Sequence, residues 1–381
     1  MYFKAVQFLE QCGLDGLLFI GDSICDSDMF YLSHFLAGDR FTLLLQEKIS
    51  LLVSSMELGR ASHESLADEV ISTTEYGIVE RLRASEKPDA AYLEVLKEFL
   101  KDHGVRRVGV PFRFPAGVFQ QLGKDFEIEI VESPVSRWRA VKTQGELNAI
   151  RQSQRACEKA MRLAVQLIAS SEPRGDQLFR QGRPLTSEQV RSAIEVSLLN
   201  EGCEAVDTIV AGGLAAADPH ARGSGPLPAN APIVIDIFPR SKCSRYFADM
   251  TRTVLKGEAA PEVLDLYEAV SSAQDAGLAA IRAGVRGRDV HHEVCKVFEE
   301  CGYPEREGRG FTHSTGHGVG LEVHERPSLS EAGEVLEAGN VVTVEPGLYY
   351  QEIGGVRLED LVAVTDEGCE NITKFERRLV L

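Results

Sequence analysis

The sequence predicts a two-domain protein of the α/β (α+β) class. Its 381 residues are 44% hydrophobic, which is enough for two sizeable cores. Apolar, β-rich runs alternate with a helical pattern in the first third, and pairs of helical segments separated by paired strands follow. A polar, proline-containing linker is expected at residues 132–137. We therefore place an N-terminal α/β domain at residues 1–135 and a C-terminal domain at residues 136–381.

The N-terminal domain is predicted to be a small sheet covered by helices. Residues 91–102 have apolar side chains at helical spacing and predict a helix. Short apolar runs predict buried strands at residues 16–20, 41–45, 49–53 and 108–110.

The C-terminal domain is predicted to begin with a pair of helices. The first covers residues 144–170 and starts at a capping-box pattern of Thr143 and Glu146. After a surface loop at residues 171–185, Thr186 and Gln189 mark the start of a second helix that ends by Gly202.

A second helix pair is expected near residues 261–283 and 288–301. Two helix pairs separated by paired strands suit two related α/β halves around a shared sheet. His291 and His292 in the last helix are expected on the surface, because adjacent residues cannot share one helix face.

Two aspartates lie in apolar, β-rich runs of the C-terminal domain. Asp236 is in the run 231–238, Asp249 is in the run 245–254, and a polar turn separates the two. A hairpin would bring the aspartates side by side across paired strands. Burying two unpaired carboxylates would cost several kcal/mol each, which indicates a function rather than a structural role.

Three further candidates follow towards the end of the chain. His317 lies among glycines in the segment 311–325, where three of the nine histidines fall. Glu345 ends an apolar run just before Pro346 and Gly347. Glu359 follows Arg357, and strand alternation puts both on one face.

These five residues predict a metal site. Oxygen ligands with one imidazole suit hard or borderline divalent cations rather than a thiolate zinc site. Four carboxylates gathered at one place repel one another unless cations neutralise them. Two divalent ions that share carboxylates would do so, and such a pair commonly activates water for hydrolysis.

The motifs that carry these residues resemble those of the metallopeptidase superfamily of methionine aminopeptidase, prolidase and aminopeptidase P, above all its proline-directed branch. The resemblance covers roughly residues 140–381, with a weaker pattern over 1–135 that resembles the creatinase-type N-terminal domain of this branch. It implies a C-terminal pita-bread fold. The matching segments are 235–236, 247–253, 316–325, 344–347 and 357–360.

The resemblance also implies a role for each ligand. Asp236 would bind one metal ion through both of its oxygens, and Asp249 and Glu359 would bridge two ions. His317 and Glu345 would complete the shell of the other ion, and Glu345 would also shuttle protons. The implied cofactors are two divalent ions, with Mn²⁺ expected and Co²⁺, Zn²⁺ or Fe²⁺ tolerated by the same ligands.

Further residues match pocket positions of the superfamily. His220 would contact substrate, and His324 would stabilise the tetrahedral intermediate. His313 matches another pocket histidine. Arg357 matches an arginine that often contacts acids next to the metal ligands. One departure is that the superfamily commonly has Asp-x-Gly and a shorter connection between its two aspartates, whereas Asp236 precedes Ile-Phe-Pro. An even-numbered extension or a bulge keeps both aspartates on one face.

The resemblance implies hydrolysis of peptides with proline at the second position. The expected activity is that of an Xaa-Pro aminopeptidase, and the alternative is an Xaa-Pro dipeptidase (prolidase). A dipeptidase needs a cation for the free carboxylate, and the chain has Ser328 where dipeptidases of this branch place an arginine. A creatinase-like amidinohydrolase and a non-catalytic binding protein are rivals, but neither would keep five intact ligands.

Composition restricts the partners and the compartment. The net charge of −17 disfavours nucleic acids and anionic membranes, and no apolar run approaches the ~18 residues of a membrane span. The chain shows no signal-peptide pattern, and its eight cysteines are scattered without a C-x-x-C motif. We expect a cytoplasmic enzyme with reduced thiols, and the resemblance implies a homodimer.

Overall fold

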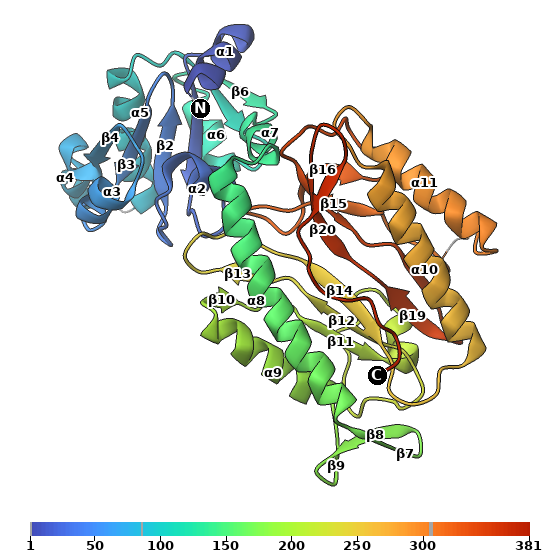
Figure 1. Ribbon diagram of the computed structural model, residues 1–381. Coiled ribbons are helices and arrows are strands. Elements are labelled where there is room, and N and C mark those ends of the chain that lie inside the picture. The colour runs from blue at the N-terminus through green and yellow to red at the C-terminus, as the bar shows by residue number, and fades with distance from the viewer. Residues whose placement is uncertain (1, 85–86, 305–307) are drawn as a thin grey trace. The chain divides into compact units, whose positions relative to one another are not determined.

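The computed structural model describes residues 2–84, 87–304 and 308–381. The chain forms two compact units, Met1–Trp138 and Arg139–Leu381 (Figure 1). Each unit has its own buried clusters of apolar side chains. The candidate site residues all belong to the second unit.

The first unit contains a six-stranded mixed sheet in the order β4-β3-β2-β1-β5-β6. Its strands are β1 Gly16–Gly21, β2 Phe41–Leu45, β3 Ile49–Val53, β4 Glu69–Ser72, β5 Arg107–Pro111 and β6 Glu127–Val131. The helices are α1 Tyr2–Cys12, α2 Ser27–Ser33, α3 Leu58–Glu64, α4 Ile78–Ala84, α5 Pro88–Asp102 and α6 Ala116–Leu122, with a 3₁₀ helix at Thr73–Tyr76. Helix α7 Val135–Ala140 runs across the boundary to the second unit.

Both faces of this sheet are buried. Leu17, Phe19 and Leu43 face one apolar cluster, whereas Leu18 and Leu44 face another. Strands that are buried on both faces appear in sequence as continuous apolar runs. This explains why β1, β2, β3 and β5 were predicted and confirms the small α/β domain.

The second unit contains two helix pairs, as predicted. Helices α8 Gln144–Ala169 and α9 Ser187–Asn200 pack over strands β12 Ile233–Ile237 and β14 Met250–Val254 in one apolar cluster. Helices α10 Pro261–Ala280 and α11 Gly287–Glu300 pack against each other and against the later strands. Capping boxes at Thr143 and Thr186 start α8 and α9. Helix α10 ends before the predicted residue 283, because Ile281 already has extended backbone.

Several sheets lie between these helix pairs. The first has the order β11-β12-β14 and the second the order β16-β15-β17-β20-β21. A hairpin joins β18 to β19, and β10 pairs with β13. The strands are β10 Cys203–Glu204, β11 Ile209–Gly212, β12 Ile233–Ile237, β13 Arg240–Ser241, β14 Met250–Val254, β15 Gly316–Gly318, β16 Glu325–Leu329, β17 Val341–Val344, β18 Gly347–Tyr350, β19 Gly354–Arg357, β20 Asp360–Val364 and β21 Cys369–Asn371; a 3₁₀ helix covers Gly213–Ala217.

Three local predictions were wrong. The expected loop at 171–185 is a three-stranded sheet of β7 Glu172–Arg174, β8 Gln177–Arg180 and β9 Arg183–Pro184, in which Leu178 is buried against α8 and α9. Part of the expected linker forms α7. His291 is buried and bonded to Thr315, while only its neighbour His292 is exposed.

Strand alternation directs the site residues away from the helices. In β12, Ile233, Ile235 and Ile237 pack against α8 and α9, so Val234 and Asp236 face the opposite side. In β17, Val342 and Val344 pack with α10 and α11, so Thr343 and the following Glu345 face away from them. The two helix pairs therefore cover the outside of the strands, and the polar residues gather between.

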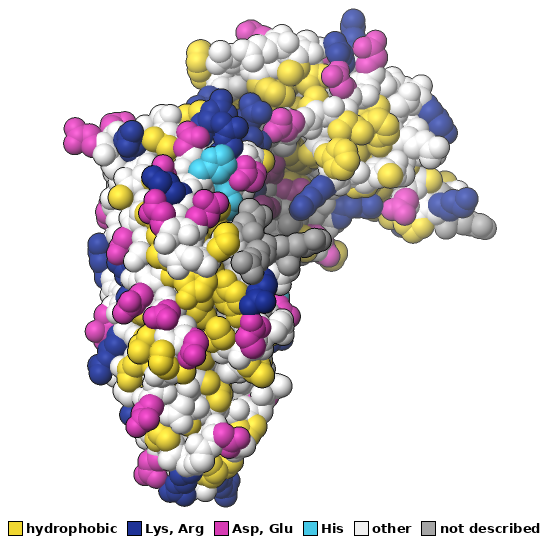
Figure 2. All heavy atoms as spheres, turned by 90° about the vertical axis from the view of Figure 1, so that its right-hand side faces the viewer, with side chains coloured by type: hydrophobic (Ala, Val, Ile, Leu, Met, Phe, Trp, Pro, Cys, Tyr) yellow, Lys and Arg dark blue, Asp and Glu magenta, His cyan; other side chains and the backbone are white. Residues whose placement is uncertain are grey.

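The outer surface carries mixed charges. On the face seen in Figure 2, acidic side chains are interspersed with basic ones over the second unit, and apolar side chains are exposed among them. No helix in the described ranges is long and apolar enough to cross a membrane.

Candidate metal centre and substrate pocket

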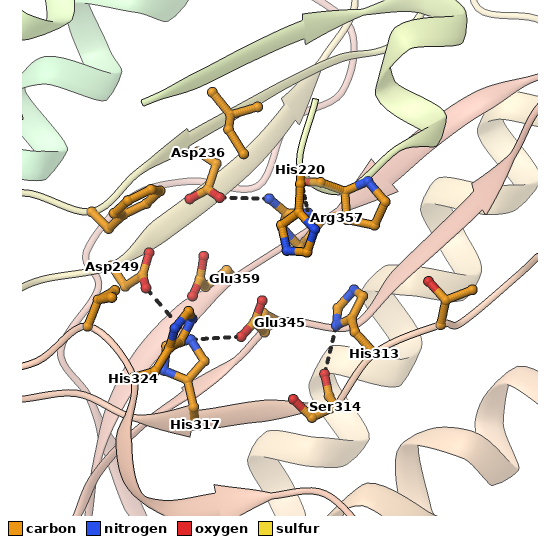
Figure 3. A pocket seen from close by; sticks show the side chains of 15 residues that line it. His220, Asp236, Asp249, His313, Ser314, His317, His324, Glu345, Arg357 and Glu359 are labelled. Atoms are coloured by element: carbon orange, nitrogen blue, oxygen red, sulfur yellow. Dashed lines mark hydrogen bonds and ion pairs between the residues drawn. The ribbon is translucent and has the colours of Figure 1, made fainter. Parts of the chain in front are cut away.

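All nine predicted site residues line one pocket of about 640 Å³ in the second unit. Figure 3 shows Glu345 and Glu359 in its middle, between Asp236 on one side and His317 with His324 on the other. The remaining lining residues are Ile209, Pro219, Phe238, Thr312, Ser314 and Val323.

The two aspartates share a face but are not directly opposite. Asp236 pairs in register with Thr251, and Asp249 precedes β14 by one residue. Asp249 is therefore the diagonal neighbour of Asp236, two residues before Thr251 on the same face. The longer connection between the strands thus leaves both carboxylates facing the pocket.

Asp236 is held by Arg357. The Arg357 Nη2 donates to Asp236 Oδ2 at 2.7 Å, and both side chains are buried. The other oxygen, Oδ1, is buried without a hydrogen-bond partner among the described residues. Burial raises the pKa of Asp236, and the neighbouring charge of Glu345 adds to this, although the Arg357 charge opposes it.

Asp249, His317 and Glu359 form a compact group of possible metal ligands. One ligand atom of each lies within 4.8 Å of the others. Burial and repulsion by neighbouring carboxylates raise the pKa values of Asp249 and Glu359 well above their usual range. Thr251 donates to Glu359 Oε2 at 2.8 Å, and Oε1 is buried without a partner in the described chain.

Glu345 and His317 form an ion pair at the edge of this cluster. The His317 Nε2 lies 3.1 Å from Glu345 Oε1 and 3.8 Å from Asp249 Oδ2. The His317 Nδ1 lies 3.1 Å from the Gly318 carbonyl, so donation there leaves Nε2 directed at the acids. Burial opposes the charge of both partners, yet their contact raises the pKa of His317 and lowers that of Glu345 to about 2.

The other three histidines line the pocket in different ways. The His313 Nε2 is 2.9 Å from the Tyr349 hydroxyl, and its Nδ1 is 2.8 Å from the Ser314 carbonyl. The ring of His324 meets that of His317 edge-on at 4.2 Å between centroids. His220 is exposed. Burial lowers the pKa values of His313 and His324.

Several polar residues around the site were not predicted, among them Thr251 and Tyr349. Thr251 accepts from Arg357 Nε at 3.1 Å and donates to Glu359, and Tyr349 lies 2.9 Å from both Arg357 Nη1 and His313. Thr251 could have been found, because it shares a strand face with Asp249. Nothing in the sequence around Tyr349 distinguishes it from an ordinary strand tyrosine.

Comparison with known proteins decides the family. Residues 148–366 match the profile of metallopeptidase family M24. The chain belongs to this family. An Xaa-Pro dipeptidase of Pyrococcus horikoshii is 28% identical over 386 aligned positions, which cover 99% of this chain and 97% of the relative.

Two solved structures show the same fold over the whole chain. The prolidase of Pyrococcus horikoshii OT3 has a TM-score of 0.81 at 27% identity, covering 99% of both chains. The X-Pro aminopeptidase of Thermotoga maritima MSB8 has a TM-score of 0.80 at 28% identity, covering 98% of this chain and 99% of the other. The predicted metallopeptidase with a pita-bread domain is thereby confirmed.

The M24 site fits a divalent metal. Two buried carboxylate oxygens, on Asp236 and Glu359, have no hydrogen-bond partner within residues 2–84, 87–304 and 308–381, and a buried acceptor left unpaired is costly. Burial and repulsion by neighbouring carboxylates raise the pKa values of Asp249 and Glu359, so the protein alone stabilises their ionised forms poorly. A cation would correct both deficits, and carboxylates with one imidazole are suitable ligands.

Proposed function

We propose that this M24 peptidase is an Xaa-Pro dipeptidase that uses two divalent ions. The observation that carries the proposal is the convergence of three buried carboxylates, the partly buried Glu345 and His317 at one pocket, where two carboxylate oxygens have no hydrogen-bond partner among the described residues. The substrate class is supported by the full-length relatives, among them the Pyrococcus horikoshii Xaa-Pro dipeptidase. The enzyme is proposed to be a cytoplasmic homodimer.

Each ligand is assigned from its place in the pocket. Asp249, Glu359 and His317 would hold one ion, because their ligand atoms already lie within 4.8 Å of one another. Asp236 would add the second ion through its unpaired Oδ1, and Asp249 and Glu359 would be shared. Glu345, beside His317, would complete the set. Mn²⁺ is the proposed metal, and Co²⁺, Zn²⁺ and Fe²⁺ suit the same donors.

The ions would act as Lewis acids that polarise the scissile carbonyl and make water nucleophilic near neutral pH. The protein's side chains would then carry out the proton transfers. Glu345 is ionised, so it can accept a proton from the attacking water and pass it to the leaving nitrogen. His220 and His324 line the pocket and would stabilise the charge that develops on the substrate. Arg357 would hold Asp236 in place.

An Xaa-Pro aminopeptidase is the second candidate. The nitrogens of Arg357 donate to Asp236, Thr251 and Tyr349, so this guanidinium is already engaged. Ser328 stands where, by the resemblance, dipeptidases of this branch place an arginine, and from the sequence this favours an aminopeptidase. A dipeptide's carboxylate would therefore have to be met by pocket histidines, whereas a longer peptide needs no such contact.

Purified protein loaded with Mn²⁺ and assayed on Xaa-Pro dipeptides and Xaa-Pro-Yaa tripeptides separates the candidates. Cleavage of dipeptides alone supports the dipeptidase, and cleavage of tripeptides alone supports the aminopeptidase. Xaa-Ala peptides of matched length control for the proline requirement, and chelated enzyme controls for metal dependence. No cleavage of either class by metal-loaded protein would overturn the proposal in favour of an amidinohydrolase or a binding protein.

A further inference from the structure

His324 lines the pocket, and no hydrogen bond holds its ring in the part of the chain that the structure describes. Among the described residues, its ring contact is the edge-on approach to His317, and the side chain is exposed. His313, in contrast, is fixed at both ring nitrogens by Ser314 and Tyr349. The position of the His324 imidazole therefore depends on its backbone and on the contact with His317.

The next residue fixes that backbone. Glu325 begins β16 and pairs in register with Gly318, beside the bulge at His317. Its Oε2 accepts from Arg139 Nη2 at 2.6 Å, and its Oε1 accepts from Lys142 Nζ at 2.7 Å. The Glu325 side chain is 5% exposed, and that of Lys142 is 0% exposed.

The two cations are themselves anchored. The Lys142 backbone nitrogen donates to the Gly339 carbonyl at 2.9 Å, and Asn340 Nδ2 donates to the Ala140 carbonyl at 3.0 Å. These contacts tie the segment 139–142 to the residues just before β17, the strand that leads to Glu345. Arg139 and Lys142, which bind Glu325, therefore belong to a segment that is itself held in place within the second unit.

The turn before His324 closes on the same carboxylate. A Cβ on Gly320 would lie 2.1 Å from Glu325 Oε1, so the carboxylate packs directly against this glycine. The Gly320 carbonyl accepts from the Phe247 backbone nitrogen at 2.8 Å. The turn from Gly320 to Glu325 is thus held by hydrogen bonds at both of its ends, and His324 lies between these ends.

We propose that Glu325, clamped by Arg139 and Lys142, is a positioning residue that sets the place of His324 in the substrate pocket. Glu325 would touch neither substrate nor metal. The inference rests on the proposed function, because it gives His324 a task in peptide hydrolysis. Misplacing a group that contacts the reacting atoms by about 1 Å can cost roughly 100-fold in rate.

A double-mutant cycle tests this. Glu325→Gln should lower kcat by about 10- to 100-fold with KM nearly unchanged, because His324 would act on the transition state more than on substrate binding. In the His324→Ala background, adding Glu325→Gln should cost less than about twofold, since the residue that Glu325 positions is gone.

Metal content and a control variant distinguish the loss of His324 positioning from general structural damage. Metal content by elemental analysis should be the same in all variants, because Glu325 is not a ligand. Glu334→Gln is the matched control, since Glu334 also pairs with a cation, Arg326 of β16, at 2.8 Å from its Nε, but does not adjoin His324. This control should change kcat by less than about threefold in both backgrounds.

The outcomes are distinct. An equal loss from Glu325→Gln with and without His324, or no loss at all, would overturn the proposal while wild-type cleavage of Xaa-Pro peptides still supported the proposed function. Wild-type protein that cleaves none of these peptides would instead refute the proposed function. If Glu325→Gln does not fold, Lys142→Gln removes one of the two cations that bind Glu325 and leaves Arg139 in place. This variant should show a smaller loss of kcat, which again disappears in the His324→Ala background.

Discussion

At the scale of single residues, the acids of the pocket fall into two electrostatic classes. Burial and mutual repulsion raise the pKa values of Asp236, Asp249 and Glu359. Burial opposes the charge of the partly buried Glu345 as well, but the contact with His317 lowers its pKa to about 2. Opposite environments for neighbouring acids are typical of sites that divide roles between them. Glu345 is therefore the acid that is held in the ionised form, which a proton acceptor must have.

Replacing Glu345 with glutamine should lower kcat by at least about 100-fold, because general acid–base catalysis contributes about 10²- to 10⁴-fold. The fold should survive, since glutamine keeps the size of the side chain. Steady-state kinetics on the better substrate class, together with a thermal unfolding curve, measures both effects. Activity within tenfold of wild type, at full metal content, would rule out Glu345 as the proton acceptor.

The candidate ligands could be predicted because each has a local signature. Asp236 and Asp249 are acids inside apolar runs, and His317 lies among glycines. Their contacts could not be predicted, because these depend on strand register across large sequence distances. Thr251, for instance, lies between Glu359 and Arg357, which are more than 100 residues away in the chain.

At the scale of elements, β15 needs glycine to place His317. A Cβ on Gly316 would lie 2.0 Å from the Thr343 carbonyl oxygen, so a side chain would force β15 away from β17. Gly316→Ala should destabilise the protein by about 1–3 kcal/mol and reduce metal content, since overpacking shifts the backbone. Thermal unfolding and elemental analysis measure the two effects.

Gly145→Ala is the matched control in the same unit. It lies in the first turn of α8, and the nearest atom to its added Cβ would be Thr143 Oγ1 at 3.9 Å. This variant should be neutral or slightly stabilising, because alanine restricts the unfolded chain more than glycine does. If both variants behaved alike, close packing at Gly316 would not explain its presence.

The capping box of α8 makes a second prediction at this scale. Thr143 Oγ1 accepts from the Glu146 backbone nitrogen at 3.3 Å, and Glu146 Oε2 accepts from the Thr143 nitrogen at 2.6 Å. Thr143→Ala should cost about 1 kcal/mol, as for other lost N-caps. Differential scanning calorimetry should show a lower Tm, and Thr143→Ser should restore it. A Tm equal to wild type for Thr143→Ala would contradict a stabilising cap.

Elements with strong local signals were predicted well, and those that depend on tertiary contacts were not. The apolar periodicity and caps of α8 and α9 are read directly from neighbouring residues. The small sheet of β7, β8 and β9 is polar at its surface, and only Leu178 is buried. Helix α7 follows Pro134, which the sequence pattern presents as a linker. His291 was misplaced because its partner, Thr315, is distant in the chain.

At the scale of the whole molecule, the acidic cluster opposes folding when no cation is present. The pKa values of Asp249 and Glu359 are raised in the folded protein. For each of these acids, the contribution to the free energy of unfolding is fully present below the ordinary pKa of about 4. It is lost as pH rises through the higher pKa of the folded protein. At neutral pH the metal-free second unit should therefore carry a penalty that a bound cation removes.

Adding Mn²⁺ at neutral pH should raise the Tm of the chelated protein. A ligand at about 100 times its Kd stabilises by roughly 2.7 kcal/mol. For a unit of this size each kcal/mol corresponds to about 2–4 °C, so the expected rise is about 5–10 °C. The rise should shrink as pH falls towards 5, because protons then compete with the metal for Asp249 and Glu359. Thermal scans in Mn²⁺ and in chelator across this pH range measure it.

The variant Asp249→Asn tests whether the acidic cluster causes both the low stability of the metal-free protein and its response to Mn²⁺. Removing one of the repelling carboxylates should raise the Tm of the metal-free protein at neutral pH and reduce its response to Mn²⁺, because one shared ligand is lost. Both changes should fade at acidic pH, where Asp249 of the wild type is already protonated. An unchanged response to Mn²⁺ would mean that the stabilising ions bind elsewhere, and a lower metal-free Tm would mean that Asp249 stabilises the fold through its contact with His317.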